Sequence, residues 1–578
     1  ESGNESGNES DNDSKDSVKL NEDDSFAYTH SRSHMAITKA FDDKQVTKRK
    51  EWLKRFKRDD LLEYKANMKV SYTDFIDRDL IFFSNLDNDR SIPSMTDGLK
   101  PSQRMILYCC FKRGRRAKEI KVAQLSGYVS ENTDYHHGEA SLQGAIIGLA
   151  QNFPGSNNIN LLTPGGNFGY RRQGGKDHAS ARYIHTQMEP ITCTIFREED
   201  EEVLTYNYAD DKRVEPIKYA PIIPMILVNG SQGIGTGFST NIPPHNPRDI
   251  VSNLKRMINE ETPKDMNPWF HGFKGTVEKK PNHENKYTIK GKYTIDGNIV
   301  HIEDIPIING WIEPYEFKMQ SKEAVSKDDT SPLEHFKSHP GNNVIDITLT
   351  FRRKGLQSLY KTGTLDKYLH MTQNMSVSNL HLFNSQNKMT KYDYIEDIMH
   401  DFYEYRLDVY ELRKAFFLKK LLNDLNIYKY KVMFIEEYLN GTLLIARKKV
   451  TQVIQQLEDK KYPRLANDHR VSDDVRSYRY LTDMTILTLT EDKIRELKNK
   501  MKECQMRYDE YLNTPIKDMW NRELDEFLEA YDKWCVNWEN ENSTKSPTKK
   551  KTKSSNSKRK TKETENPKKT KKVVKKKT

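Results

Sequence analysis

Apolar residues recur at alternating four- and three-residue steps along the last third of the chain. The first run comprises Ile398, Phe402, Tyr405, Val409, Leu412 and Phe416 and, after one slip, Leu418, Leu421, Leu425, Tyr428, Val432, Ile435 and Leu439. The second run comprises Ile494, Leu497, Met501, Cys504, Tyr508 and Tyr511. This spacing is typical of a coiled-coil seam, which needs a partner helix to cover it. We therefore predict two long helical arms that pair antiparallel, the second of which ends before Pro515.

The apolar stretch at 443–445 lies between the two runs, so this pairing puts it at the far tip of the arms. An exposed apolar tip favours contact with a second copy of the chain. We predict that residues 391–538 form the arms and the interface of a homodimer.

Length and composition indicate several domains. The chain has 578 residues, which exceeds what one hydrophobic core normally serves. Its five cysteines show neither a CxxC spacing nor a paired framework, which is typical of reduced thiols in an intracellular protein. No run of about 18 apolar residues occurs, so we expect no membrane partner.

The net charge of +10 is unevenly distributed. Residues 545–578 carry 16 Lys and Arg against two Glu, so the rest of the chain is slightly acidic. We expect residues 539–578 to be a disordered Lys-rich tail that binds DNA non-specifically and in a salt-dependent way. The polar, acidic residues 1–33 are expected to be a disordered linker.

The middle of the chain divides into two parts by pattern. Residues 34–185 mix short helices with basic loops, whereas residues 186–390 contain segments with strand periodicity, such as 287–295 and 344–349. We therefore predict an α+β multidomain fold.

The dipeptide Arg182–Tyr183 is the strongest candidate for chemistry. A phenol has a reference pKa of about 10, so forming the phenolate at neutral pH costs about 4 kcal/mol, and a nucleophilic tyrosine needs a cation or base beside it. Arg182 is adjacent, and Lys176 follows two glycines that allow close approach of backbone to a phosphate. An isolated Arg-Tyr pair is ordinarily just a surface turn, so the surrounding sequence must show whether this pair has a chemical role.

Six further blocks surround the loop at 174–186 in a fixed order. They are 88–94 (NDRSIPS), 97–104 (DGLKPSQR), 121–127 (KVAQLSG), 135–139 (YHHGE), 151–158 (QNFPGSNN) and 223–237 (IPMILVNGSQGIGTG). In this order and spacing the chain resembles, over roughly residues 34–535, the DNA breakage–reunion part of the type IIA DNA topoisomerases. The match is nearest to the C-terminal half of the single-chain enzymes of eukaryotes and large DNA viruses.

The resemblance implies a winged-helix DNA-cleavage domain at 34–185, a mixed α/β tower domain at 186–390, and double-stranded DNA as partner. It also implies a nuclear location. Tyr183 would attack DNA and become linked to the 5′ phosphate, Arg182 would neutralise the attacked phosphate, and His137 would hydrogen-bond near the active site. Further matched positions would contact DNA phosphates; these are Arg90, Arg104, Lys121, Lys176 and His136.

Ile234 matches a position that wedges between base pairs and bends the duplex. An apolar side chain between glycines on a loop is poorly explained as core, and unstacking costs a few kcal/mol per step. Ala181 stands where many family members have proline. This loosens one backbone restraint but removes no chemical group.

Type IIA enzymes bind Mg²⁺ on an acidic TOPRIM domain and ATP on another domain. The sequence contains neither motif, so we expect both cofactors to be bound by domains absent from this chain, in a longer polypeptide or a partner subunit. Two alternatives remain open. The chain could be a separate A-type subunit, as in gyrase and topoisomerase IV, or an inactive architectural protein that bends DNA.

Overall fold

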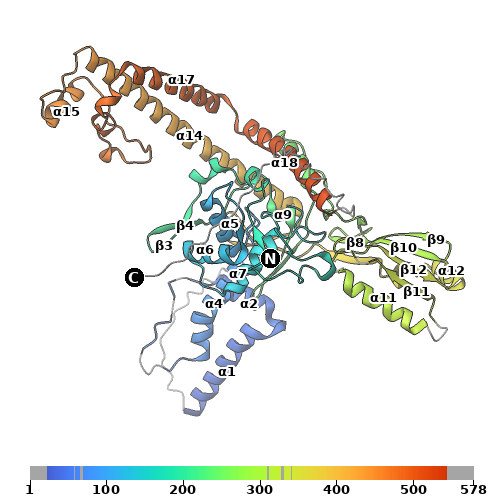
Figure 1. The fold of residues 1–578 in the computed structure, drawn as a ribbon. Coiled ribbons are helices and arrows are strands. Elements are labelled where there is room, and N and C mark those ends of the chain that lie inside the picture. Colours follow the sequence, from blue (N-terminus) through green and yellow to red (C-terminus); the bar gives the residue numbers. More distant parts are fainter. Residues whose placement is uncertain are drawn as a thin grey trace, which may run out of the picture.

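The structure is a computed structural model and describes residues 22–542 except 58, 61, 66–68, 309–310, 327–330 and 340. Most of the tail predicted at 539–578, and residues 1–21 of the predicted linker, therefore lie outside the described residues. A central body carries three projecting parts (Figure 1): a helical N-terminal part, a β-rich part and a pair of long helices.

The N-terminal part has a small core of its own, built from Trp52, Leu53, Ile76 and Ile81. Its helical elements are α1 (Glu22–Phe41), α2 (Val46–Lys54), α3 (Tyr72–Asp74), the π-helical turn η2 (Phe75–Leu80) and α4 (Ile81–Ser91). The linker predicted for 1–33 is wrong over residues 22–33, because α1 begins at Glu22. The segment 22–41 contains no glycine or proline, and its alanines at 36 and 40 pack into the core, which favours a helix.

The central body shares one large hydrophobic core that runs from Met95 to Trp534. Its helices are α5 (Pro101–Arg113), α6 (Val122–Asn132), α7 (Glu139–Ala150), α8 (Thr192–Ile195), α9 (Met225–Asn229) and α10 (Pro247–Ile258). Three two-stranded pairings complete it: β1 (Ile120–Lys121) with β2 (His185–Thr186), β3 (Tyr206–Ala209) with β4 (Lys212–Pro216), and β5 (Ser231–Ile234) with β6 (Ser239–Ile242). The core continues across residues 185 and 390, where the sequence predicts domain boundaries.

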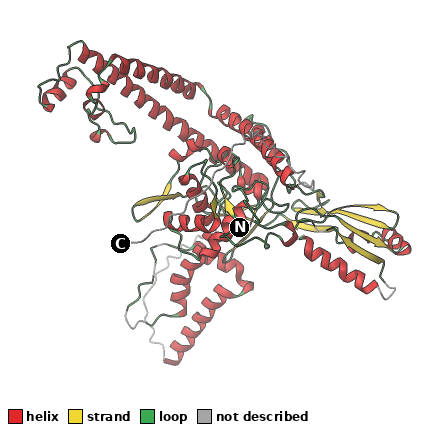
Figure 2. Ribbon diagram, in the orientation of Figure 1, coloured by secondary structure: helices red, strands yellow, loops and turns green. Residues whose placement is uncertain are grey.

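The β-rich part has a separate core over residues 300–371 (Figure 2). Its four-stranded antiparallel sheet has the order β11 (Leu333–Ser338), β12 (Ile347–Phe351), β10 (Ile299–Asp304) and β9 (Lys292–Asp296). Two further sheets pack on the core of the central body instead. One has the order β13 (Thr372–Ser376), β8 (Lys286–Lys290) and β7 (Thr276–Lys279), and in the other β14 (Leu380–Phe383) pairs with β15 (Met389–Tyr392). The helices of the β-rich part are α11 (Ile312–Ser326), α12 (Arg353–Lys361) and α13 (Leu365–Tyr368).

The segment predicted as alternating at 287–295 is split into β8 and β9 at Gly291. A Cβ at this position would lie 2.6 Å from the Asp304 carbonyl oxygen, so only glycine allows the two sheets to meet here. The strand periodicity is therefore confirmed, with a break that the pattern did not reveal.

The two long helices are α14 (Ile395–Leu439) and α17 (Glu491–Asn513), and they lie antiparallel as the apolar spacing predicts. Three contacts fix the direction; from the base to the tip they are Phe417 with Tyr511, Leu421 with Cys504, and Glu436 with Lys498. Helix α17 ends before Pro515, and α18 (Ile516–Asn542) returns to the central body.

The predicted seam is wrong at Leu412 and Leu439, which are exposed, whereas Arg406 and Arg413 are buried. Around Leu412 the reason is that the first half of α14 packs on α18 and on the short helix η4 (Glu198–Glu202), not on α17. Leu439 is the last residue of α14. The predicted spacing holds in the second half, where Val432, Ile435 and Leu497 share a core.

The tip of the arms carries α15 (Val450–Asp459) and α16 (Arg479–Thr482). Leu443 is buried in a core of the tip itself, and within the apolar stretch at 443–445 only Leu444 is exposed. The apolar surface predicted for contact with a second copy is therefore smaller than expected.

None of the helices that the structure describes is long and apolar enough to span a membrane.

Candidate active site and nucleic-acid interface

The segment that carries Tyr183 is pinned to the start of α6. The amides of Ala123 and Val122 donate to the carbonyl oxygens of Ala181 (3.1 Å) and Ile184 (3.0 Å). Ala181 and Ile184 point inward and are buried, which forces the two residues between them outward. Tyr183 is 69% exposed, whereas most large side chains of this body contribute to the core. The backbone therefore presents this phenol to solvent on a fixed support.

Arg182 is exposed beside the phenol. Its guanidinium carbon lies 5.4 Å from the centre of the Tyr183 ring. Among the described residues it forms no salt bridge, so its charge is available to an incoming anion. Lys121 also lies at this place, because β1 and β2 pair Lys121 with His185, two residues beyond Tyr183. Lys121 is exposed.

Gly174 and Gly175, which precede Lys176, are required by the packing of their own loop. Gly174 and Gly175 adopt positive φ angles of 64° and 78°, and a Cβ on them would collide with Trp311 and with Gln151, respectively. Their role is thus internal packing, and the expected close approach of this backbone to a phosphate is not needed to explain them. Lys176 itself is exposed and follows them in the same loop.

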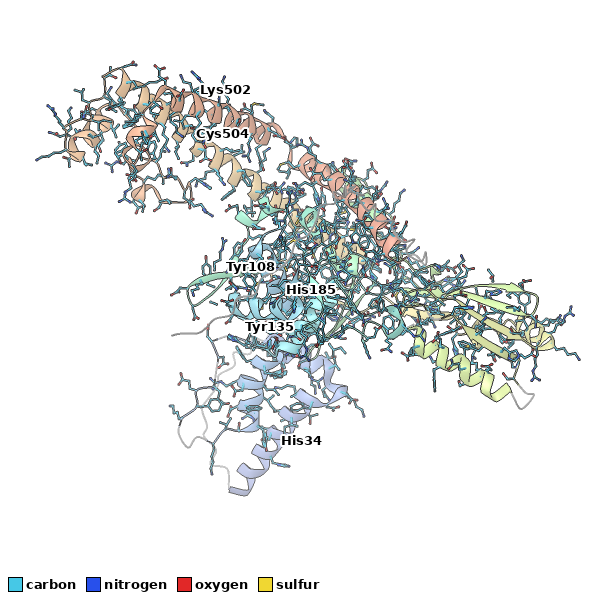
Figure 3. The ribbon with its side chains drawn as sticks, in the orientation of Figure 1. His34, Tyr108, Tyr135, His185, Lys502 and Cys504 are labelled. Atoms are coloured by element: carbon cyan, nitrogen blue, oxygen red, sulfur yellow. The ribbon has the colours of Figure 1, made fainter. Side chains whose placement is uncertain are left out.

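The Tyr135–Glu139 block precedes α7 as an exposed loop. His136 Nε2 lies 2.6 Å from Asp134 Oδ1, and His137 packs edge-on against the Tyr135 ring at 5.5 Å. Both histidines are exposed, which rules out a buried structural role for His137 in this structure. Figure 3 shows Tyr135 and His185 in the same central part of the molecule.

Arg90 ends α4 near this loop. Burial raises the pKa of Tyr135, and the nearby charge of Arg90 opposes that rise, which indicates that the two residues are neighbours. Arg90 pairs with Asp87 at 3.0 Å but is 57% exposed, so the pair is weak and a phosphate can replace it.

Arg104, in contrast, is not available to DNA. Its side chain makes two hydrogen bonds to the Asp97 carboxylate (2.7 and 3.0 Å) and one to the Leu99 carbonyl (3.1 Å). Burial alone would lower the pKa of Arg104, but the Asp97 carboxylate raises it above its usual value. The predicted phosphate contact at Arg104 is wrong, since the residue holds the turn before α5 in place.

This difference gives a paired prediction. Arg104→Gln is expected to destabilise the central body by about 3–5 kcal/mol, because it leaves the fully buried Asp97 without its partner. Arg90→Gln is expected to leave stability unchanged and to reduce by about one the slope of log affinity for DNA against log salt concentration. Peptide-level hydrogen exchange over α5 and salt-dependent DNA titrations measure the two effects. Lost protection in Arg90→Gln, or normal protection in Arg104→Gln, contradicts the geometry.

Ile234 is 85% exposed at the turn of the β5–β6 hairpin. The hairpin lies tightly on the end of α4: a Cβ on Gly233 would collide with the Ser91 carbonyl, and one on Gly235 with the Asn88 side chain. Asn88 Nδ2 also donates to the Thr236 carbonyl at 3.0 Å. Glycines on both sides thus seat the hairpin while the isoleucine projects outward, close to the α4 end that carries Arg90.

A basic cluster behind this hairpin was not recognised from the sequence. Lys50 Nζ lies 3.4 Å from His381 Nε2 and 5.0 Å from the centre of the Phe238 ring. Burial, Lys391 and Lys54 together lower the pKa of Lys50. The basic run at 48–50 was a possible signal, but only the fold brings residues 50, 238 and 381 together.

Comparisons with known proteins identify the family of this chain. The family model for the DNA gyrase/topoisomerase IV A subunits matches residues 90–525, which is most of the chain. This chain belongs to that family. The model for the C-terminal associated domain of TOPRIM matches residues 7–88. The two matches meet at the end of α4, whereas the sequence predicted a boundary between residues 33 and 34.

Individual relatives point the same way. The chain is 36% identical to DNA topoisomerase 2 of Acanthamoeba polyphaga mimivirus (86% of this chain, 44% of the relative) and 38% identical to that of Arabidopsis thaliana (86% and 36%). The crystal structure of the Plasmodium falciparum topoisomerase II DNA-binding, cleavage and re-ligation domain is 36% identical, with a TM-score of 0.77, over 89% of this chain and 71% of that one. The resemblance to type IIA topoisomerases is confirmed; the chain spans less than half the length of these curated relatives.

Proposed function

We propose that this chain is the DNA breakage–reunion core of an ATP-dependent type II DNA topoisomerase. In this proposal a homodimer makes a transient double-strand break through two 5′-phosphotyrosine linkages, passes a second duplex through it, and so relaxes and decatenates DNA in the nucleus. The observation that carries the proposal is the exposed Tyr183 phenol beside the exposed Arg182 guanidinium, on a rigid support, in a member of this family.

The chemistry follows from these side chains. The Tyr183 oxygen attacks the phosphorus of a phosphodiester and forms a new P–O bond, while the bond from phosphorus to the 3′ oxygen breaks. The phenol gives up its proton as this bond forms, and the departing 3′ oxygen takes up a proton to become a hydroxyl, so the step releases no net proton. Arg182 stabilises the extra negative charge that develops on the phosphoryl oxygens. The phosphotyrosine ester keeps the bond energy, so the reverse attack reseals the strand without an external energy source.

The proposed DNA surface combines exposed basic side chains around this phenol: Arg90, Lys121, Lys176 and His136, together with His137 near the reacting phosphate. The basic cluster at Lys50 extends it behind the Ile234 hairpin. Helices α5–α7 would form the winged-helix domain, residues 186–390 the tower, and α14 with α17 the coiled coil whose tip joins the dimer. Contacts that are mainly to phosphates give low sequence specificity.

The cofactors implied for the whole enzyme are Mg²⁺ and ATP. Within the ranges that the structure describes, no group of three or more His, Cys, Asp or Glu side chains lies close enough together to hold a metal ion. In this proposal both cofactors would be bound by other parts of the enzyme, as the resemblance implies.

A prediction for Ile234 separates bending from binding. Ile234→Ala is expected to abolish most of the DNA bend while changing affinity by less than about tenfold, because the lost apolar contact is offset by base stacking that no longer has to be broken. Energy transfer between dyes at the two ends of a short duplex measures the bend. Ile295→Ala, which alters another exposed isoleucine, is the control and should bend DNA normally. An unchanged bend in Ile234→Ala contradicts the wedge.

The alternatives are weaker. A separate A-type subunit is disfavoured by relatives that are named DNA topoisomerase 2 and that extend well beyond the matched region. A purely architectural function does not require an exposed phenol fixed beside Arg182. A protein of that kind would tolerate the loss of the Tyr183 hydroxyl, which the covalent mechanism does not.

A further inference from the structure

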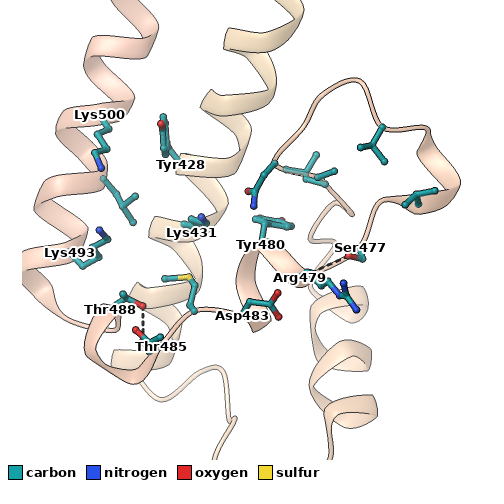
Figure 4. Close-up of a pocket in the computed structure, with 17 residues that line it drawn as sticks. Tyr428, Lys431, Ser477, Arg479, Tyr480, Asp483, Thr485, Thr488, Lys493 and Lys500 are labelled. Atoms are coloured by element: carbon teal, nitrogen blue, oxygen red, sulfur yellow. Dashed lines mark hydrogen bonds between the residues drawn. The ribbon is translucent and has the colours of Figure 1, made fainter. Parts of the chain in front are cut away.

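A large pocket lies far from the proposed cleavage site, near the tip of the arms (Figure 4). It has a volume of about 620 Å³ and lies between the paired helices α14 and α17 on one side and residues 465–488 on the other. Hollows of roughly 300–1,000 Å³ are the usual size for small-molecule sites.

The wall formed by the two helices is cationic. Lys431 comes from α14, and Lys493 and Lys500 come from one face of α17, two helical turns apart. Arg479 adds a fourth cation from the opposite wall, and among the described residues Asp483 is the only carboxylate that lines the pocket. Figure 4 shows the three lysines on the two neighbouring helices, with Lys431 next to Tyr428 and Tyr480.

Lys431 is poorly balanced by negative charge. No carboxylate of a described residue lies within salt-bridge distance of it, whereas Lys493 and Lys500 share the Glu496 carboxylate at 2.8 and 2.6 Å. Burial lowers the pKa of Lys431, and the charges of Lys493 and Lys500 lower it further. Four cationic side chains therefore line one hollow against the Asp483 carboxylate and the shared Glu496 carboxylate, so an anion that enters it meets an excess of positive charge.

The placement of the cations selects the charge of the anion. The Glu496 carboxylate already bridges the ammonium groups of Lys493 and Lys500. An anion that also meets Lys431 on α14 and Arg479 on the opposite wall must carry several negative charges along its length, as a chain of phosphates does. A DNA duplex is too wide for a hollow of this volume.

We propose that this pocket binds a small polyphosphate, either free or as the polyphosphate of a nucleotide, through the ammonium groups of Lys431, Lys493 and Lys500. The hydroxyl of Tyr428 adds a hydrogen-bond donor on the same wall as Lys431. The site is separate from Tyr183 and does not depend on the proposed function.

Site-resolved lysine acylation of the whole chain, read by mass spectrometry, tests the proposal. Sodium tripolyphosphate is expected to suppress acylation of Lys431, Lys493 and Lys500 at concentrations that leave Lys419 unchanged. Lys419 is an exposed lysine of α14 outside the pocket and controls for non-specific attraction. Protection that is absent, or equal at Lys419, overturns the proposal. So does protection by adenosine, or by duplex DNA but not tripolyphosphate.

Two further arms define the ligand and the residues. ATP that protects at much lower concentration than tripolyphosphate assigns the site to a nucleotide, and equal protection assigns it to free polyphosphate. Lys431→Gln should weaken protection of Lys493 and Lys500 by about tenfold or more, since a charged hydrogen bond contributes roughly 1.5–3 kcal/mol. Lys419→Gln should have no effect, and equal effects of the two variants contradict the site.

Discussion

Tyr183→Phe is expected to abolish covalent DNA–protein adducts and to leave DNA affinity unchanged. The substitution removes the one oxygen that attacks phosphorus and keeps the ring, so the loss in adduct formation should be roughly 10⁴-fold or more, as for other lost nucleophiles. The variant is made in the whole enzyme that contains this chain. Adducts are trapped by denaturation and counted as protein-linked DNA, and affinity is measured separately by titration.

A closely matched control exists in Tyr208. It is 70% exposed against 69% for Tyr183, and it lies on the β3–β4 hairpin away from Arg182. Tyr208→Phe should form adducts at the normal rate. Equal activity of wild type and Tyr183→Phe removes the covalent mechanism and favours the architectural alternative. A parallel loss of DNA binding would instead make the phenol a structural contact.

Glu523→Gln is expected to destabilise the junction between α14 and α18 by about 3–5 kcal/mol. Glu523 accepts hydrogen bonds from Arg413 (2.5 Å) and from the Tyr410 hydroxyl (2.7 Å), and Asp200 binds both Arg413 and Arg406. These side chains are almost fully buried. The amide has the same shape but no charge, so Arg413 keeps its buried charge with less compensation.

Glu526→Gln is the control on the same helix. Glu526 pairs with Arg197 at 2.7 Å but is 48% exposed, so its loss should cost less than about 1 kcal/mol. Peptide-level hydrogen exchange over α14 and α18 measures both effects locally, which matters because a chain of several domains does not unfold in one step. Equal protection in the two variants contradicts the assigned role of the buried network.

The same network gives a pH dependence with a defined sign. Burial alone would raise the pKa of Glu523, but Arg413 and Arg406 outweigh it and hold the pKa below its usual value. The stability from this group is thus complete above the unfolded value of about 4.3 and is lost as pH falls through the lower folded value. The difference in exchange between wild type and Glu523→Gln should therefore shrink in acid.

The sequence predicted the parts of the site that depend on local pattern. Tyr183, Arg182 and Ile234 stand out because each is an unusual residue in its immediate context, and all three are exposed in the structure. The antiparallel pairing of α14 and α17 likewise follows from apolar spacing within each helix.

The sequence-based predictions fail where contacts between distant parts of the chain determine whether a residue is buried or exposed. Arg104 is predicted to contact a DNA phosphate because it is a basic residue in a matched block, but the turn before α5 buries it against Asp97. Gly174 is predicted to let a phosphate approach the backbone, but Trp311 from another part of the chain occupies that space. Leu412 fits the heptad, but that part of α14 turns its arginines toward Asp200 and Glu523 instead. None of these partners is visible in a window of local sequence.

Mapping the nucleotide in a trapped adduct tests the central claim most directly. After nuclease digestion and trypsin, we predict that one nucleotide is joined through its 5′ phosphate to Tyr183, in the peptide 183–197 or, with the cleavage after Arg182 blocked, 177–197. A nucleotide on any other side chain, or one attached through its 3′ phosphate, would contradict the covalent mechanism.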